Sequence, residues 1–259
     1  MRPALFLAHG SPMIAIEESD YGTFLDGLRE RIGRPRAIVL FSAHFESDVQ
    51  VVSEVERYST LYDFGGFPDA LYQIQYPARG DIALAHRIES QLQEAGIAWR
   101  AEAARGLDHG AWTLLTRLYP AADVPVVEMS VNQRLSPAEQ YRIGQSLAPL
   151  REEDVLILGS GVTVHNFQLL SGSVNPGTLD GVRAFEAWLQ DRLKAWDLPA
   201  LFAYESSAPS AQLAVPARGR EHFSPLFYVM GAADKPASVE VWHESWLWNV
   251  MTNTAYAMH

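Results

Sequence analysis

The stretch ALFLAHGSP, residues 4–12, has the pattern that decides the fold: an apolar run ends on a histidine, and glycine and proline follow. The same arrangement returns at AIVLFSAHF, residues 37–45, and at DVLILGSGVTVHN, residues 154–166. Continuous apolar runs of this length are typical of strands that are covered on both faces of a sheet. The sequence therefore predicts three buried strands, with His9, His44 and His165 just past their carboxyl ends.

Segments with helical periodicity alternate with these strands. Residues 19–33 have a cap at Ser19 or Asp20 and end at Gly33, and Ser136 with Glu139 forms a capping box at the start of residues 136–150. Further helices are expected over residues 81–96, 110–120 and 179–196, the last with Phe185, Leu189 and Trp196 inside. Strands are expected over residues 49–55 (beside the strand 36–44), 97–103 and 124–131, and within 238–258. This alternation predicts an α/β fold with helices on both faces of the sheet.

Composition limits the function of this chain of 259 residues. Its net charge is −11, and no cluster of Lys or Arg offsets it, which argues against a nucleic-acid surface. No stretch has the roughly 20 apolar residues of a membrane span, and the first apolar run is too short for a secretory signal. A soluble cytoplasmic protein without a membrane partner is therefore expected. Because the chain has no cysteine, any metal must be held by His, Asp or Glu.

The histidines at the strand ends are the candidate site. Ligands of open α/β sheets bind beyond the carboxyl ends of the strands, and imidazole is a good ligand for iron and zinc. His222, in REHFSPLFYVMG (residues 220–231), has Glu221 as a neighbour, and Pro225 is expected to open a short helix there. The alternative is that each histidine is buried separately and hydrogen-bonded to the backbone.

The other histidines differ in their surroundings. His109, in GLDHGAW, precedes a helix; Asp108 beside it is suited to cap that helix, and Gly110 leaves room for a ligand. His86 is expected on the surface of its helix and His243 in the core or at a sheet edge. The aromatic segment YSTLYDFGGFPDALYQIQYP, residues 58–77, is expected to be a loop that either lines an apolar pocket or simply packs.

Together, the stretches LFLAHGSPM, FSAHFES, GLDHGAWTLL, LILGSGVTVHN and REHFSPLFYVMGAA resemble the class III extradiol ring-cleavage dioxygenases, and among them the 4,5-DOPA dioxygenase-like subgroup. The matching stretches run in the family's order from residue 5 to residue 233. The resemblance implies one catalytic domain over residues 1–259, a mixed β-sheet and a non-haem Fe(II) centre. It implies a catechol substrate, similar to L-DOPA, that is opened with O2.

The resemblance also implies roles for single residues. His9, His44 and His222 would hold the metal, and His165 would be a further ligand or the acid/base residue. His109 would line the substrate pocket and is the second candidate for the base. The family's usual metal site has two histidines and one carboxylate, so either His222 replaces the carboxylate or Glu221 supplies it; His222 is the expected ligand. An all-histidine site also suits Zn(II).

Two other functions use the same residues. A zinc-dependent hydrolase would activate water without O2, and a non-catalytic metal-binding protein would turn over no catechol with any metal. The oligomeric state, the physiological catechol and the ring bond that is cut are left open by the sequence.

Overall fold

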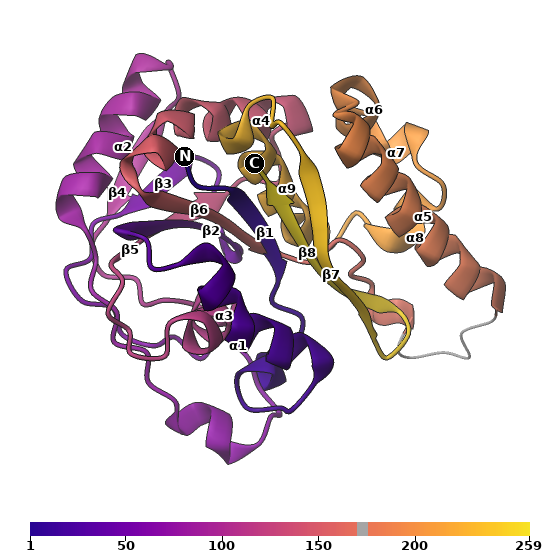
Figure 1. The fold of residues 1–259 in the computed structure, drawn as a ribbon, viewed down its shortest axis with the longest axis horizontal. Helices are drawn as coiled ribbons and strands as arrows, with labels where there is room; N and C mark the ends of the chain where they lie inside the picture. Colours follow the sequence, from indigo (N-terminus) through magenta and orange to yellow (C-terminus); the bar gives the residue numbers. More distant parts are fainter. Residues whose placement is uncertain (170–175) are drawn as a thin grey trace.

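A mixed sheet of eight strands forms the centre of the protein in the computed structural model, which describes residues 1–169 and 176–259. The strand order is β4-β3-β5-β2-β6-β1-β8-β7, and Figure 1 shows the sheet with helices packed around it. The strands are β1 (Ala4–Ala8), β2 (Ala37–Glu46), β3 (Gln50–Ser53), β4 (Trp99–Glu102), β5 (Val126–Val131), β6 (Val155–Gly161), β7 (Val239–Leu247) and β8 (Met251–Met258).

The central strands β5, β2, β6 and β1 are parallel, whereas β8 runs antiparallel to β1 and β3 runs antiparallel to β5. The expectation that residues 49–55 lie beside the strand 36–44 is wrong: β3 pairs with β4 and β5. Both edges of β2 are already occupied, because β5 and β6 pair with it on either side. The segment 238–258 forms the hairpin β7–β8, which lies at the other edge of the sheet (Figure 1).

Nine α-helices are assigned in residues 1–169 and 176–259, and they cover both faces of the sheet, as the sequence predicts. They are α1 (Asp20–Ile32), α2 (Ile82–Glu94), α3 (His109–Leu118), α4 (Pro137–Ser146), α5 (Pro176–Ala195), α6 (Leu198–Phe202), α7 (Tyr204–Ser207), α8 (Ala211–Ala214) and α9 (Arg220–Ala233). Short 3-10 helices span Pro12–Ala15, Asp69–Gln73, Ala148–Glu153 and Phe167–Leu169. None of the helices in the described ranges is long and apolar enough to span a membrane.

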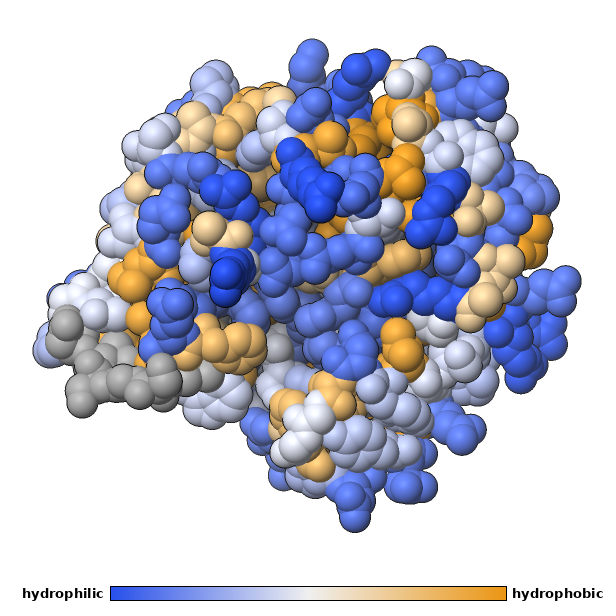
Figure 2. All heavy atoms as spheres, turned by 180° about the vertical axis from the view of Figure 1, so that it is seen from behind, coloured by the Kyte–Doolittle hydropathy of each residue, from blue (hydrophilic) through white to orange (hydrophobic). Residues whose placement is uncertain are grey.

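The alternation of side chains along the strands creates one core on each face of the sheet. In β1, Ala4 and Phe6 belong to the core formed with α2, α4, α5 and α9, whereas Leu5 and Leu7 belong to the core formed with α1 and α3. Because both faces are covered, the side chains of the central strands are buried almost throughout. On the reverse side of the molecule, Figure 2 shows the apolar residues scattered among hydrophilic ones over the part that the described residues form.

The predicted helix caps are present. Ser19 Oγ accepts a hydrogen bond from the backbone N of Gly22, and Ser136 and Glu139 form the capping box of α4. Asp108 caps α3 through the backbone N of Ala111.

Two details of the predicted helices are wrong. Trp196 packs against the core as expected, but it does not belong to α5, because the helix ends at Ala195 and Trp196 adopts a φ of 51°. Pro225 does not open a helix: α9 begins at Arg220 and contains Pro225 in its second turn. A proline there removes a single backbone donor, and its ring packs over Gly161, where a Cβ would lie 3.2 Å from Pro225 Cγ.

Candidate active site

Four histidines from different parts of the chain meet at the carboxyl ends of the central strands. His9 directly follows β1, and His165 lies four residues beyond the end of β6. His222 lies in the first turn of α9, which packs against β6. His44 does not follow its strand as expected, because β2 continues to Glu46, which still pairs with Val131 of β5 after a register shift.

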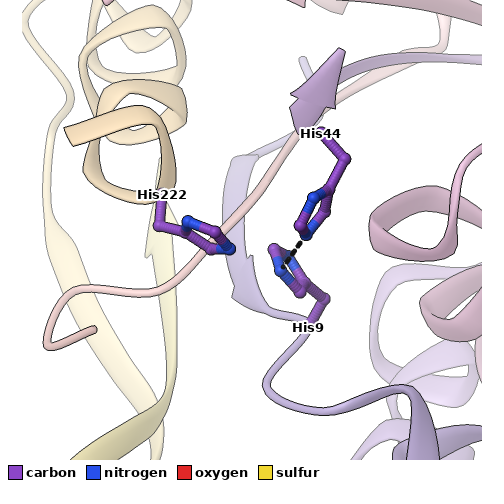
Figure 3. A group of neighbouring side chains, drawn as sticks. All are labelled: His9, His44 and His222. Atoms are coloured by element: carbon purple, nitrogen blue, oxygen red, sulfur yellow. Dashed lines mark hydrogen bonds between the residues drawn. The ribbon is translucent and has the colours of Figure 1, made fainter. Parts of the chain in front are cut away.

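Three of these histidines form a compact group of possible metal ligands. One ring nitrogen from each of His9, His44 and His222 lies within 4.8 Å of the others. Figure 3 shows the three rings turned toward one another, with Nε2 of His9 3.0 Å from Nε2 of His44. Side chains that are separated by up to 213 residues in the sequence therefore point into one small volume.

The hydrogen bonds behind the rings decide which nitrogens are free. The hydroxyl of Ser160 donates to the carbonyl of Gly110 (2.6 Å), so its oxygen accepts from Nδ1 of His9 (2.9 Å). His222 Nδ1 donates to a carboxylate oxygen of Glu221, again at 2.9 Å. A neutral imidazole that donates through Nδ1 carries its lone pair on Nε2. His9 and His222 therefore both present an unprotonated Nε2, the form that binds a metal.

Burial keeps the grouped rings neutral. It lowers the pKa of His9 and of His222 well below the ordinary value, and the neighbouring histidines lower both further. Burial, followed by the charge of His109, lowers the pKa of His44 to about 4. Neutral imidazoles carry no positive charge that would repel a cation, and their unprotonated nitrogens can bind one. A divalent cation would therefore be a suitable occupant of the group.

His165 and His109 lie beside the group in different ways. The ring of His165 stacks on that of His222, with centroids 3.6 Å apart and planes 11° from parallel. Burial, followed by His222, lowers the pKa of His165 to about 2. The ring centroids of His109 and His44 are 3.9 Å apart.

Asp63 holds His109 in place, a role that sequence reasoning missed. Its Oδ1 accepts hydrogen bonds from the backbone N of His109 (3.0 Å) and from Nδ1 of the same residue (2.9 Å). When the ring is neutral, this hydrogen bond leaves the lone pair on Nε2 of His109. Burial opposes the charge on Asp63, yet the hydrogen bonds from His109 bring the pKa of this carboxyl below its ordinary value. Asp63 lies in the aromatic segment 58–77, which is a loop except for the short 3-10 helix Asp69–Gln73. In the sequence, nothing distinguishes Asp63 from other acidic residues in loops.

Gly110 leaves space for protein atoms and not for a ligand, contrary to the expectation. A Cβ at this position would lie 2.8 Å from Ser42 Oγ and 3.1 Å from Cδ2 of His44. The glycine therefore lets α3 approach β2 closely enough to bring His109 against His44.

A cavity of about 190 Å³ opens over the histidines. His44, His109, His165 and His222 form its polar part, and its apolar walls are Phe64, Phe67, Phe167, Trp248 and Met251. Phe64 and Phe67 come from the aromatic segment, and Trp248 lies at the turn between β7 and β8. The cavity is thus a mainly aromatic recess with ring nitrogens at one end, which suits a flat apolar molecule with a polar edge.

Comparison with known proteins gives consistent results. The profile of the family "Catalytic LigB subunit of aromatic ring-opening dioxygenase" matches residues 3–259. The chain is 40% identical to a 4,5-DOPA dioxygenase extradiol of Beta vulgaris, over 99% of this chain and 96% of the relative. It is 36% identical to a protein of the same description from Escherichia coli K12, over 92% and 89% of the two chains. The crystal structure of an uncharacterized protein from Escherichia coli K12 superposes with a TM-score of 0.83 at 30% identity, and all of both chains is covered.

Proposed function

Because the chain belongs to the family of the catalytic LigB subunit of aromatic ring-opening dioxygenases, we propose that it opens the ring of a catechol by extradiol cleavage with O2. The proposed substrate is a catechol similar to L-DOPA, as in the names of the relatives from Beta vulgaris and Escherichia coli. The observation that carries the proposal is the group of three imidazoles, two of which, His44 and His222, line an aromatic cavity. We also propose that residues 1–259 form one catalytic domain, since β1 and β8 are neighbours in the same sheet.

The family implies a metal cofactor, and the histidine group fits one. We assign His9, His44 and His222 as its ligands, because their ring nitrogens converge and two of them have Nε2 free. Glu221 accepts the hydrogen bond from His222 Nδ1, so it orients a ligand and leaves Nε2 of His222 for the metal. We propose Fe(II) as the active ion, and Zn(II) as an ion that the same nitrogens also bind.

The remaining histidines are suited to move protons. An ion held by His9, His44 and His222 would supply vacant coordination positions for the diol and for O2. His109, fixed by Asp63, presents a free Nε2 to the cavity side of the group, where it can accept a proton from a catechol hydroxyl. His165 faces the same cavity from its position against His222, and we propose that it shares this acid/base work and does not coordinate the metal.

The aromatic walls orient the ring and exclude water. At about 190 Å³ the cavity is smaller than pockets for drug-sized ligands, which measure about 300–1,000 Å³, and this favours a substrate with one ring. Phe64, Phe67 and Phe167 offer faces and edges on which a catechol ring can pack. The diol would then lie toward the histidines, where polar partners are available.

The proposed function is tested by loading metal-free protein with Fe(II) without oxygen, then adding L-DOPA and oxygenated buffer. We expect O2 uptake together with a yellow ring-opened product. His44→Ala should abolish both, whereas His259→Ala, which removes an imidazole outside the group, should keep them. Activity that is equal with Zn(II) and without O2 would support the hydrolase instead. No turnover of any catechol would leave only a metal-binding protein.

The role of His165 needs a separate measurement. In His165→Ala we expect metal content close to that of the unsubstituted protein and a kcat about 100- to 10,000-fold lower, as for loss of an acid/base residue. Loss of the metal from this variant would instead make His165 a ligand.

A further inference from the structure

A second group of possible metal ligands lies away from the cavity, where α2 packs against β3. Glu54 directly follows β3, and His86 and Glu89 project from the same side of α2 at a spacing of three residues. One ligand atom from each of the three lies within 4.8 Å of the others. The Nε2 of His86 is 3.5 Å from Oε1 of Glu54. Figure 1 shows α2 beside β3 and β4, at the edge of the sheet opposite the hairpin β7–β8.

Glu89 distinguishes this group from ordinary surface acids. Its side chain is buried, with 7% of the residue exposed, and no described residue donates a hydrogen bond to its Oε1. A buried carboxylate oxygen without a donor is costly, and most such oxygens in proteins are paired. Burial and the adjacent carboxylate of Glu54 together raise the pKa of Glu89 to about 7. Two carboxylates this close need either a shared proton or a cation between them.

We propose that Glu54, His86 and Glu89 form a second metal site, which takes a divalent transition metal such as Zn(II). The mixture of one imidazole nitrogen and two carboxylate oxygens suits Zn(II), whereas Ca²⁺ and Mg²⁺ prefer oxygen ligands alone. The cation would offset the charges of both carboxylates and give the unpartnered oxygen of Glu89 a ligand bond. The remaining coordination positions would be filled by water, because His86 and Glu54 are accessible from solvent.

A metal bound here would join α2 to the sheet. Glu54 is the first residue after β3, and the chain that follows carries Phe64 and Phe67 to the cavity and Asp63 to His109 before it returns to α2. A metal at this site would therefore link residue 54 to residues 86–89, and so hold together the two ends of the intervening segment, without contacting the catechol. Its predicted effect is on the stability of α2 against β3, since anything that binds only the folded state stabilises it.

The experiment counts bound Zn(II) by calorimetric titration of metal-free protein. We compare the unsubstituted chain with His86→Ala, Glu89→Gln and the matched control Glu94→Gln, which removes an exposed carboxylate from the same helix. His86→Ala and Glu89→Gln should each bind one equivalent less, or bind it at least about tenfold more weakly, since even indirect partners of a metal cost 10- to 100-fold. Glu94→Gln should bind as much as the unsubstituted chain.

A variant that lacks two of the proposed active-site ligands separates binding at this site from binding at the active site. In His9→Ala/His44→Ala, one equivalent should remain and should raise the melting temperature, and adding His86→Ala should remove both effects. Equal Zn(II) binding by the unsubstituted chain, His86→Ala and Glu89→Gln would overturn the proposal. So would binding of Ca²⁺ at the same strength as Zn(II), because imidazole would then not be a ligand.

Discussion

Gly161, the last residue of β6, offers a direct test of how the fold positions a metal ligand. A Cβ on this residue would lie 2.2 Å from the carbonyl oxygen of His222, against 3.4–4 Å for ordinary contact. The same carbonyl accepts a hydrogen bond from the backbone N of Val162 at 2.8 Å, so it is held toward the strand. In Gly161→Ala the first turn of α9 must therefore move by about 1.2 Å, the difference between 3.4 and 2.2.

The expected consequences of Gly161→Ala are a loss of stability and a loss of metal affinity. Overpacking of a well-packed interior costs about 1–3 kcal/mol, which urea unfolding of the metal-free protein would measure. Metal–ligand distances tolerate shifts of about 0.2 Å, so a displaced His222 should weaken Zn(II) or Fe(II) binding at least tenfold by calorimetry.

The control is the same substitution where space is available. Gly27 lies in the middle of α1 with no atom within 4 Å of the added Cβ. Gly27→Ala should stabilise the protein by about 0.5–1 kcal/mol and leave metal binding unchanged. If Gly161→Ala were destabilised as expected yet bound metal with unaltered affinity, the proposed coupling between β6 and His222 would be refuted.

Three further substitutions test the surroundings of the site. Asp63→Ala should lower kcat about 10- to 100-fold, because His109 loses its orienting carboxylate; an unchanged kcat would contradict this. Burial and Asp108 raise the pKa of Glu128, so the folded state loses stability as the pH rises above the unfolded value of about 4.3. Glu128→Gln should therefore stabilise the protein more at pH 8 than at pH 4 in urea unfolding, and equal gains would count against it. Trp248→Ala should raise KM for the catechol about 2- to 10-fold with little change in kcat, measured by O2 uptake.

Much of the fold follows from local sequence patterns. The apolar runs that include Ala4–Ala8 and Val155–Gly161 are strands because their side chains alternate between two separate cores, and the caps at Ser19 and Ser136 fix where helices begin. The partners of β3 could not be predicted in the same way, since strand order depends on which edges are already occupied.

The site was less accessible to sequence reasoning. The residues themselves suggest His9, His44 and His165, because strand ends in α/β sheets are where sites form. His222 lies on a helix that reaches the group only through contacts with β6, and its role was implied by the family resemblance. Asp63 was missed altogether, because its importance comes from a tertiary contact with the start of α3.

The pairing of β1 with β6 on one side and β8 on the other has a consequence for biosynthesis. Strand β1 is translated before both of its neighbours: β6 becomes available only after residues 155–161 have been made, and β8 only after residues 251–258. During that time Phe6 and Leu7, both destined for the interior, have no sheet to join, and His9 has no fixed position. The sheet is therefore completed only late in translation, and a stop codon before β8 would leave β1 with an open edge and the neighbouring histidine poorly anchored.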